Sequence, residues 1–104
     1  MSGSRLTEIE DHVVVLTRAL LDEYELKLKA GGLVATIQPI RRMGDGGSYS
    51  SELIVDFTNI ACPREIADVI EFSICQEGRA AASLSNIEAW LREALDDVIE
   101  RRQS

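Results

Sequence analysis

Hydrophobic side chains in the first quarter of the chain recur every three or four residues, as they do on one face of an α-helix. These positions are Ile9, Val13, Leu16, Leu20 and Tyr24. Thr7 and Glu10 have the spacing of a capping box, in which Thr7 is the N-cap and Glu10 reaches back to it. Gly31 and Gly32 predict the end of this helix.

The next three segments alternate between apolar and polar residues, a pattern typical of β-strands. They are residues 33–41, 51–59 and 67–76, and Pro39 indicates an edge position or the end of the first strand. One face is expected to carry Leu33, Ala35, Ile37, Leu53, Val55, Phe57, Ile70, Phe72 and Ile74. The opposite face is expected to carry Val34, Thr36, Gln38, Ile54, Asp56, Thr58, Val69, Glu71, Ser73 and Cys75.

A second amphipathic helix is predicted at the end of the chain. Ser85 and Glu88 form a second capping-box pattern. The apolar stripe that follows consists of Ile87, Trp90, Leu91, Ala94, Leu95, Val98 and Ile99. Trp90 is central in this stripe, so we expect it to be buried against the sheet. The segment before the helix, residues 77–84, fits either a continued strand or a loop.

The order of elements predicts a two-layer α+β fold, α-β-β-β-α. Short links favour a three-stranded antiparallel meander, and the N- and C-terminal helices would pack on one face of it. Residues 1–104 form a single domain, with a flexible N-terminus at 1–6 and a mobile glycine- and serine-rich loop at 42–51.

The glycine-rich loop raises the question of phosphate binding. Gly44, Gly46 and Gly47 precede a strand, whereas phosphate-binding loops open a helix and add a lysine and a hydroxyl residue. Asp45-Gly46 is a preferred turn dipeptide, because glycine tolerates a positive φ. We therefore expect a hairpin link that is long enough to contact a partner.

Charge narrows the range of partners. Eighteen acidic residues against eleven basic ones give a net charge of −7. An anionic protein repels nucleic-acid phosphates and anionic membranes, and it favours a basic protein partner. The chain has no signal-peptide pattern and no apolar run of roughly 20 residues, and Cys62 and Cys75 are its two cysteines. We expect a cytoplasmic protein with free thiols.

Candidate chemistry is sparse. His12 is the single histidine, and Asp11 beside it in sequence does not share its helical face. Neither cysteine has a partner at metal-ligand spacing. We therefore expect no catalytic residue, no metal and no cofactor, and no motif matches a known family.

The leading hypothesis is an immunity- or antitoxin-type inhibitor that occludes a basic, nuclease-like toxin or effector. The first alternative is a dimeric acidic secretion or assembly chaperone, which would use surplus valines on the N-terminal helix to form a homodimer. A second alternative is a small enzyme or ligand-binding protein that uses acidic residues. The candidate partner-binding residues are Asp45, Tyr49, Asp56, Thr58, Glu71 and Ser73. A sheet face that is merely solvated is the competing explanation for four of them.

Overall fold

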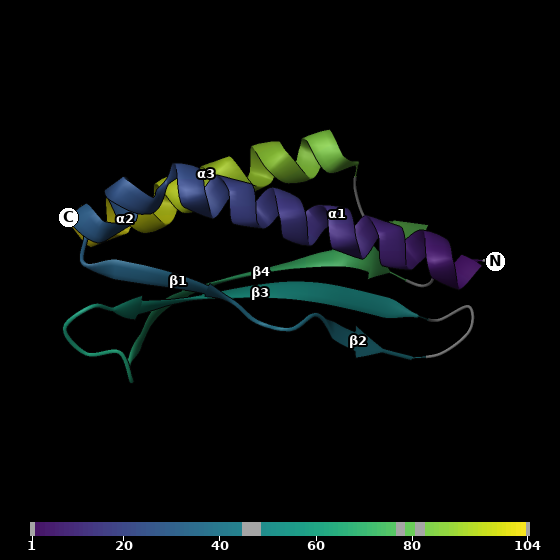
Figure 1. The fold of residues 1–104 in the computed structure, drawn as a ribbon, viewed down its shortest axis with the longest axis horizontal. Helices are drawn as coiled ribbons and strands as arrows, with labels where there is room; N and C mark the ends of the chain where they lie inside the picture. The colour runs from purple at the N-terminus through teal and green to yellow at the C-terminus, as the bar shows by residue number, and fades with distance from the viewer. Residues whose placement is uncertain (1, 45–48, 77–78, 81–82, 104) are drawn as a thin grey trace.

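The computed structural model describes residues 2–44, 49–76, 79–80 and 83–103. Three helices and five strands follow one another along the chain (Figure 1). In order they are α1 (Ser2–Glu23), α2 (Glu25–Ala30), β1 (Leu33–Ile37), β2 (Arg41–Met43), β3 (Ser50–Asn59), β4 (Ile66–Gln76), β5 (Arg79–Ala80) and α3 (Leu84–Gln103).

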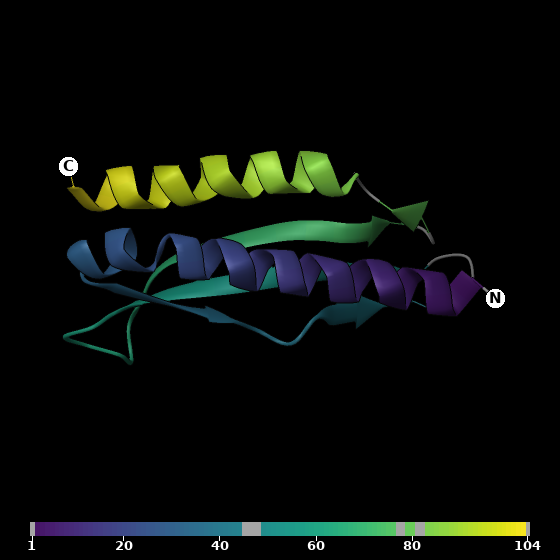
Figure 2. The same ribbon diagram turned by 45° about the horizontal axis from the view of Figure 1, so that its top comes forward.

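The helices form one layer and the sheet forms the other, which confirms the α+β prediction (Figures 1 and 2). The strand order is β1-β3-β4-β5, with β2 also paired to β3, and every pairing is antiparallel. All three helices lie on the same side of the sheet, so its other side has no covering layer in the described part of the chain.

One long strand was predicted where the structure has two short ones, β1 and β2. The N–H of Gln38 still donates to the carbonyl of Ile54 at 2.9 Å, and pairing resumes with Arg41 opposite Glu52. Two residues, Pro39 and Ile40, therefore stand opposite one. This bulge divides the strand, and Pro39, which has no N–H to donate, lies at the outer edge of the sheet.

The core lies between the helices and the inward face of the sheet. Its fully buried side chains include Leu33, Leu53, Val55, Phe57, Ile74, Leu91, Leu95 and Val98. Along β3, Leu53, Val55 and Phe57 are buried as predicted, but Ile54 of the opposite set is also only 9% exposed. Along β4 the predicted alternation fails for Cys75, which is as deeply buried as Ile74 beside it. The register shifts between Ser51 and Glu52, and this irregularity turns two successive β4 side chains inward.

Both capping-box predictions are wrong. Helix α1 begins at Ser2, so Thr7 lies inside the helix and Glu10 is not needed at its start. Helix α3 begins at Leu84, and its cap is Ser83, whose Oγ accepts a hydrogen bond from the N–H of Asn86 at 3.3 Å. The glycine ending is confirmed, since Gly32 has a left-handed φ of 76°.

Two turn regions are partly described. Met43 pairs with Ser50 and Gly44 has a φ of 80°, which confirms a hairpin between β2 and β3. Asp45 and its neighbours to residue 48 lie outside the described residues. In the ambiguous segment, β5 folds back on Cys75 and Gln76, and residues 77–78 and 81–82 are likewise not described. The mobility of residues 1–6 and 42–51 stays a prediction.

Trp90 is 42% exposed, so its predicted burial is wrong. Leu91 and Leu95 take the positions that face the sheet, and Trp90 lies on the flank of α3. There it contacts the Phe72 ring, with centroids 5.3 Å apart and planes inclined by 52°. Such a pair contributes about 0.5–1.5 kcal/mol beyond the burial of its area.

These positions predict an order of stability costs. Leu91→Ala should lower the free energy of unfolding by about 2–5 kcal/mol, as core leucine truncations do. Trp90→Ala should cost less, because a half-exposed ring loses mainly its contact with Phe72. Denaturant unfolding followed by circular dichroism measures both variants, and a larger cost for Trp90→Ala would contradict the arrangement.

Candidate functional site

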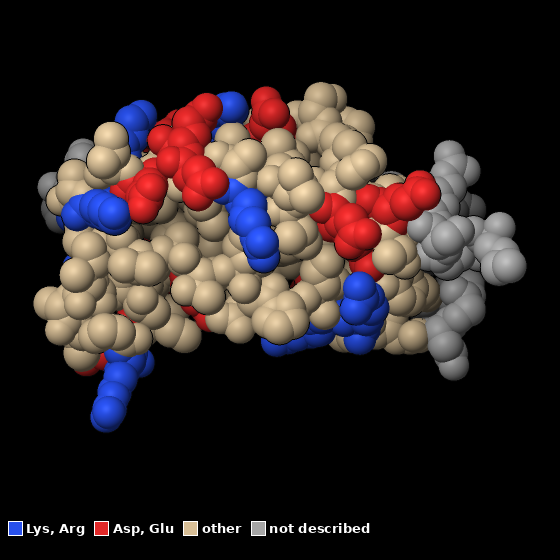
Figure 3. Space-filling model, viewed as in Figure 1, with Lys and Arg blue, Asp and Glu red and all other residues tan. Residues whose placement is uncertain are grey.

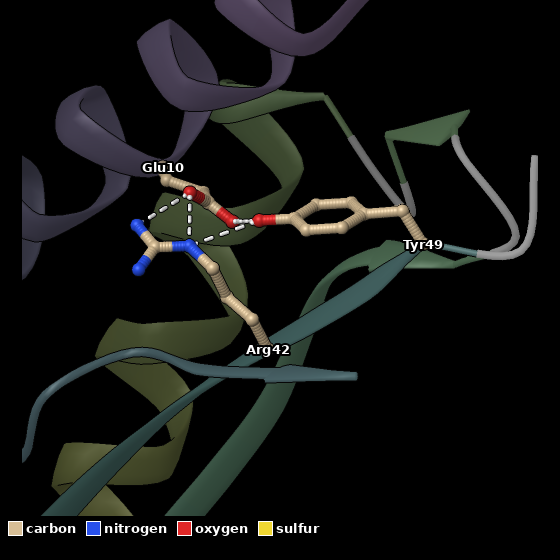
Figure 4. A network of polar contacts seen from close by, with 3 residues as sticks. All are labelled: Glu10, Arg42 and Tyr49. Atoms are coloured by element: carbon tan, nitrogen blue, oxygen red, sulfur yellow. Dashed lines mark hydrogen bonds and ion pairs between the residues drawn. The ribbon is translucent and has the colours of Figure 1, made fainter. Parts of the chain in front are cut away.

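Three polar side chains meet between the helix layer and the β2–β3 hairpin (Figure 4). Glu10 comes from α1 and has a side chain that is 0% exposed. Its Oε2 accepts a hydrogen bond from the Tyr49 hydroxyl at 2.5 Å. Its Oε1 accepts two from Arg42, from Nη2 at 3.0 Å and from Nε at 3.2 Å. Arg42 Nε also lies 3.0 Å from the Tyr49 hydroxyl.

Each member of this cluster is held in its ordinary charge state. Burial raises the pKa of Glu10, but the hydrogen bonds from Tyr49 and Arg42, the nearby Ser51 hydroxyl and the Arg42 charge outweigh burial and leave the pKa below 4.5. The hydrogen bond to Glu10 is the main reason that the pKa of Arg42 is raised. Burial, and then the bond to Glu10, raise the pKa of Tyr49. The carboxylate is therefore ionised and the phenol protonated at neutral pH.

Ser51 adjoins the cluster on β3, opposite Arg42 in the sheet register. Its hydroxyl is buried and makes no hydrogen bond of ordinary geometry to any described residue. It nevertheless lies near enough to Glu10 to help lower the pKa of that carboxyl. The Ser51 hydroxyl therefore contributes less to holding the carboxylate than the Tyr49 hydroxyl does.

The cluster has the properties of a structural clamp. A carboxylate with no exposed surface cannot reach a substrate without unfolding its surroundings, and its hydrogen bonds are all internal. Removing either partner would leave a buried charge poorly compensated, which is strongly destabilising. The clamp ties α1 to the hairpin, and it engages Tyr49, one of the predicted partner-binding residues.

Four other predicted site residues share the uncovered face of the sheet. Thr58 pairs with Val34, Asp56 stands between Thr36 and Val69, Glu71 pairs with Ile54, and Ser73 pairs with Glu52. The Asp56 carboxylate accepts a hydrogen bond from Gln38 Nε2 at 2.6 Å. The structure therefore brings these four together, while Tyr49 points to the helix layer and Asp45 lies outside the described residues.

Aliphatic side chains are exposed on this same face. Ile66 is 59% exposed, Val34 is 45% exposed and Val69 is 38% exposed. The one ion pair described on this face joins Arg41 to Glu52 at 3.2 Å. Both lysines of the chain, Lys27 and Lys29, belong to α2, so no lysine lies among these side chains. We call this set of residues, with Asp56, Thr58, Glu71 and Ser73, the open face.

Most exposed acids lie on the helices rather than on the open face. Figure 3, in the view of Figure 1, shows acidic side chains gathered over the helix layer on this side of the molecule. The exposed carboxylates of the helices are Glu8, Asp11, Asp22, Glu23, Glu25, Glu88, Glu93, Asp96, Asp97 and Glu100. Some are paired, since Arg92 bonds to Glu23 and Lys29 lies 3.0 Å from Glu25. The open face is therefore mixed in character, and the helix layer carries more of the negative charge.

A cavity of about 330 Å³ lies near the end of α3. Arg101 and Arg102 line it, but Arg101 bonds to Asp68 at 2.7 Å and Arg102 bonds to the Gly31 carbonyl at 2.9 Å. Within the described ranges, no three His, Cys, Asp or Glu side chains group as metal ligands. None of the helices described is long and apolar enough to cross a membrane.

Comparison with known proteins returns no relative. The chain matches no protein-family model, no curated protein and no solved structure.

The Glu10 cluster escaped the sequence analysis, although a signal for it exists. Glu10, Val13, Thr17, Leu20 and Tyr24 follow a three-to-four spacing, and all five are buried. An acid and a threonine therefore lie on the inward line of α1. Thr17 satisfies its hydroxyl by donating to the Val13 carbonyl at 2.7 Å. Glu10 needs partners from elsewhere in the chain, and the sequence does not reveal which ones.

The clamp predicts a pH-dependent stability. The pKa of Glu10 in the folded protein is below its ordinary 4.5, so its stabilisation is complete above pH 4.5 and is lost as pH falls through the folded value. Glu10→Gln should lower the free energy of unfolding at pH 7 by about 1.5–3 kcal/mol. The difference from the wild type should shrink below pH 4.5. Glu8→Gln, at an exposed position, is the control, and a difference independent of pH would contradict the clamp.

Proposed function

We propose that the protein is a small binding module of the immunity or antitoxin type, which captures a cationic, nuclease-like protein and occludes it. The observation that carries the proposal is the open face, where exposed aliphatic side chains surround the carboxylates of Asp56 and Glu71. Such a mixture is typical of a protein interface, in which apolar groups supply contact and charges select the partner.

The absence of lysine from the open face supports the proposal. The solvated face of an antiparallel sheet is normally lined by polar side chains. The open face instead presents Val34, Ile66 and Val69 to solvent. A face that only contacted water would gain nothing from these three side chains, whereas a partner that covered them would bury their apolar surface.

The sign of the partner's charge follows from the whole chain. A net charge of −7 steers a positively charged protein toward this one and repels anionic surfaces. A nuclease-type toxin must present cationic groups to hold phosphates, so an acidic protein can imitate the charge of its substrate. The carboxylates of the helix layer would add to the long-range attraction, and those of the open face would contact the partner directly.

A second candidate, the dimeric acidic chaperone, is favoured by exposed apolar side chains on the helices. Val15 of α1 and Leu26 of α2 are both exposed. Homodimerisation through the N-terminal helix would cover Val15. Sedimentation of wild type and Val15→Asp distinguishes the candidates, because a dimer that dissociates in the variant supports the chaperone and a monomer in both supports the inhibitor.

The test of the proposed function combines protection and binding. We expect co-expression with the product of a neighbouring gene to protect a bacterial host that this product kills. Asp56→Asn with Glu71→Gln should weaken capture of that product by about 0.2–1 kcal/mol for each charge at low salt. Higher salt should slow association more than dissociation, because charge acts mainly on encounter.

Exposed acids at the start of α1 provide the control. Glu8→Gln with Asp11→Asn removes the same charge from the helix layer and should affect capture less than the open-face pair. Normal capture by the open-face variant with loss in the helix variant would place the interface on the helices. Failure of every neighbouring product to bind or to kill would contradict the inhibitor class.

A further inference from the structure

Two backbone hydrogen bonds define toward which neighbouring strand each residue of β3 directs its N–H and carbonyl groups. Gln38 N–H donates to the Ile54 carbonyl, and Ile60 N–H donates to the Gly32 carbonyl, each at 2.9 Å. Residues of an antiparallel strand alternate in the direction of their backbone groups. The even-numbered residues of β3 therefore bond toward β1, and Leu53, Val55 and Phe57 bond toward β4.

The outward groups of β4 follow from that alternation. Ile70 pairs with Val55 and Phe72 pairs with Leu53, so both direct their backbone groups inward to β3. Val69, Glu71 and Ser73 direct theirs to the outer edge. An independent contact agrees, since the N–H of Val69 donates to its neighbour Asp68 Oδ1 at 2.9 Å instead of to β3. In the described part of the chain, β5 covers this edge beside Cys75 and Gln76 and no further.

The two edges of the sheet differ in how far they are protected against pairing with a further strand. On the β1–β2 side, Pro39 and a bulge interrupt the strand, and both are features that prevent further pairing. The 11 residues of β4 include no proline and no lysine. Register shifts flank residues 68–73, which leaves this six-residue stretch regular. Its backbone groups at Glu71 and Ser73 can accept another strand.

Apolar and charged side chains lie on both sides of this edge. On the helix side, Phe72 contacts the half-exposed Trp90 of α3. Arg101 of α3 bonds to Asp68, so the flank of α3 from Trp90 to Arg101 follows β4, and Asp97 lies on that flank by its seven-residue spacing from Trp90. On the open face, Val69 and Glu71 border the same edge.

We propose that the outer edge of β4, residues 68–73, binds an extended cationic segment of the partner protein as an added β-strand. This inference rests on the proposed function and names how the partner is held. Backbone groups of Glu71 and Ser73 supply main-chain hydrogen bonds, and the aromatic pair receives an apolar side chain of the segment. Basic side chains of the segment lie beside Glu71 and Asp97. This is the β-augmentation mode of peptide recognition.

Charge favours a cationic segment over a second copy of the chain. Two copies paired through β4 would bring together chains that each carry a charge of −7. An antiparallel pairing centred on Glu71 would also place the two Glu71 carboxylates directly opposite each other, and like charges in that position are destabilising. A basic segment meets the same carboxylates with the opposite sign.

The experiment selects ligands from a display library of linear random peptides of about twelve residues, with the full-length protein as bait. Enriched peptides should alternate apolar and basic residues and lack a central proline. Ser73→Pro removes one outward N–H without touching the ladder to β3, and it should lower their affinity about tenfold. Ser73→Thr keeps the N–H and should bind as the wild type does. The backbone N–H of Ala35 points away from β3 at the opposite edge of the sheet, so Ala35→Pro should also leave peptide binding unchanged.

A second measurement does not depend on the fold of the proline variant. Trp90 is the single tryptophan, so peptides bound beside it should shift the emission of the wild-type protein to shorter wavelength. Three results would each overturn the assignment of the β4 edge. They are equal peptide binding by Ser73→Pro and the wild type, no enrichment of any peptide, and concentration-dependent dimers of the wild type that Ser73→Pro abolishes. If Ser73→Pro still protected the host fully, the proposed function would stand and binding at the β4 edge would be wrong. If peptides bound at the edge but no neighbouring gene product were neutralised, the edge would stand as a binding site and the proposed function would be wrong.

Discussion

The placement of every helix on one face of the sheet is the constraint on which the rest of this structure depends. Leu53, Val55 and Phe57 are buried because α1 and α3 cover them. Strand alternation then directs the intervening side chains to the side that none of the described helices covers. Among the described residues, the open face is therefore a consequence of where the helices lie.

The buried carboxylate of Glu10 makes this arrangement more rigid at one end. A charge without exposed surface is tolerated only with compensating bonds, and Arg42 and Tyr49 supply them from the hairpin. Helix α1 and the β2–β3 hairpin must consequently hold one relative position. Neighbouring residues are divided between the two faces, since Arg42 turns inward to Glu10 while Arg41 pairs with Glu52 on the open face.

The sequence predicts the sheet well because period-two alternation survives wherever one face is buried and the other is not. Leu53, Val55 and Phe57 are correctly assigned to the buried face for this reason, whereas Ile54, assigned to the other face, is buried as well. Cys75 fails because a register shift breaks the period, and Trp90 fails because the apolar stripe of α3 is wider than the core it covers. Of the candidate site, Asp56, Thr58, Glu71 and Ser73 are placed together as their alternation predicts.

What the sequence could not supply is long-range pairing. Glu10 reads equally as a cap or as a core residue until Arg42 and Tyr49, more than thirty residues away, are placed beside it. The sequence also does not reveal which backbone groups of β4 point to the outer edge, because this depends on which residues of β3 bond toward β1. Side-chain patterns carry no information about that choice.

Amide hydrogen exchange of the isolated protein tests most directly whether this surface is unoccupied. The N–H groups of Ile70 and Phe72, which bond inward to β3, should exchange slowly. Those of Glu71 and Ser73 should exchange fast, and their rates should not change with protein concentration. Equal protection of all four amides, or protection of Glu71 and Ser73 that grows with concentration, would contradict the account, because it would show that the edge is already covered.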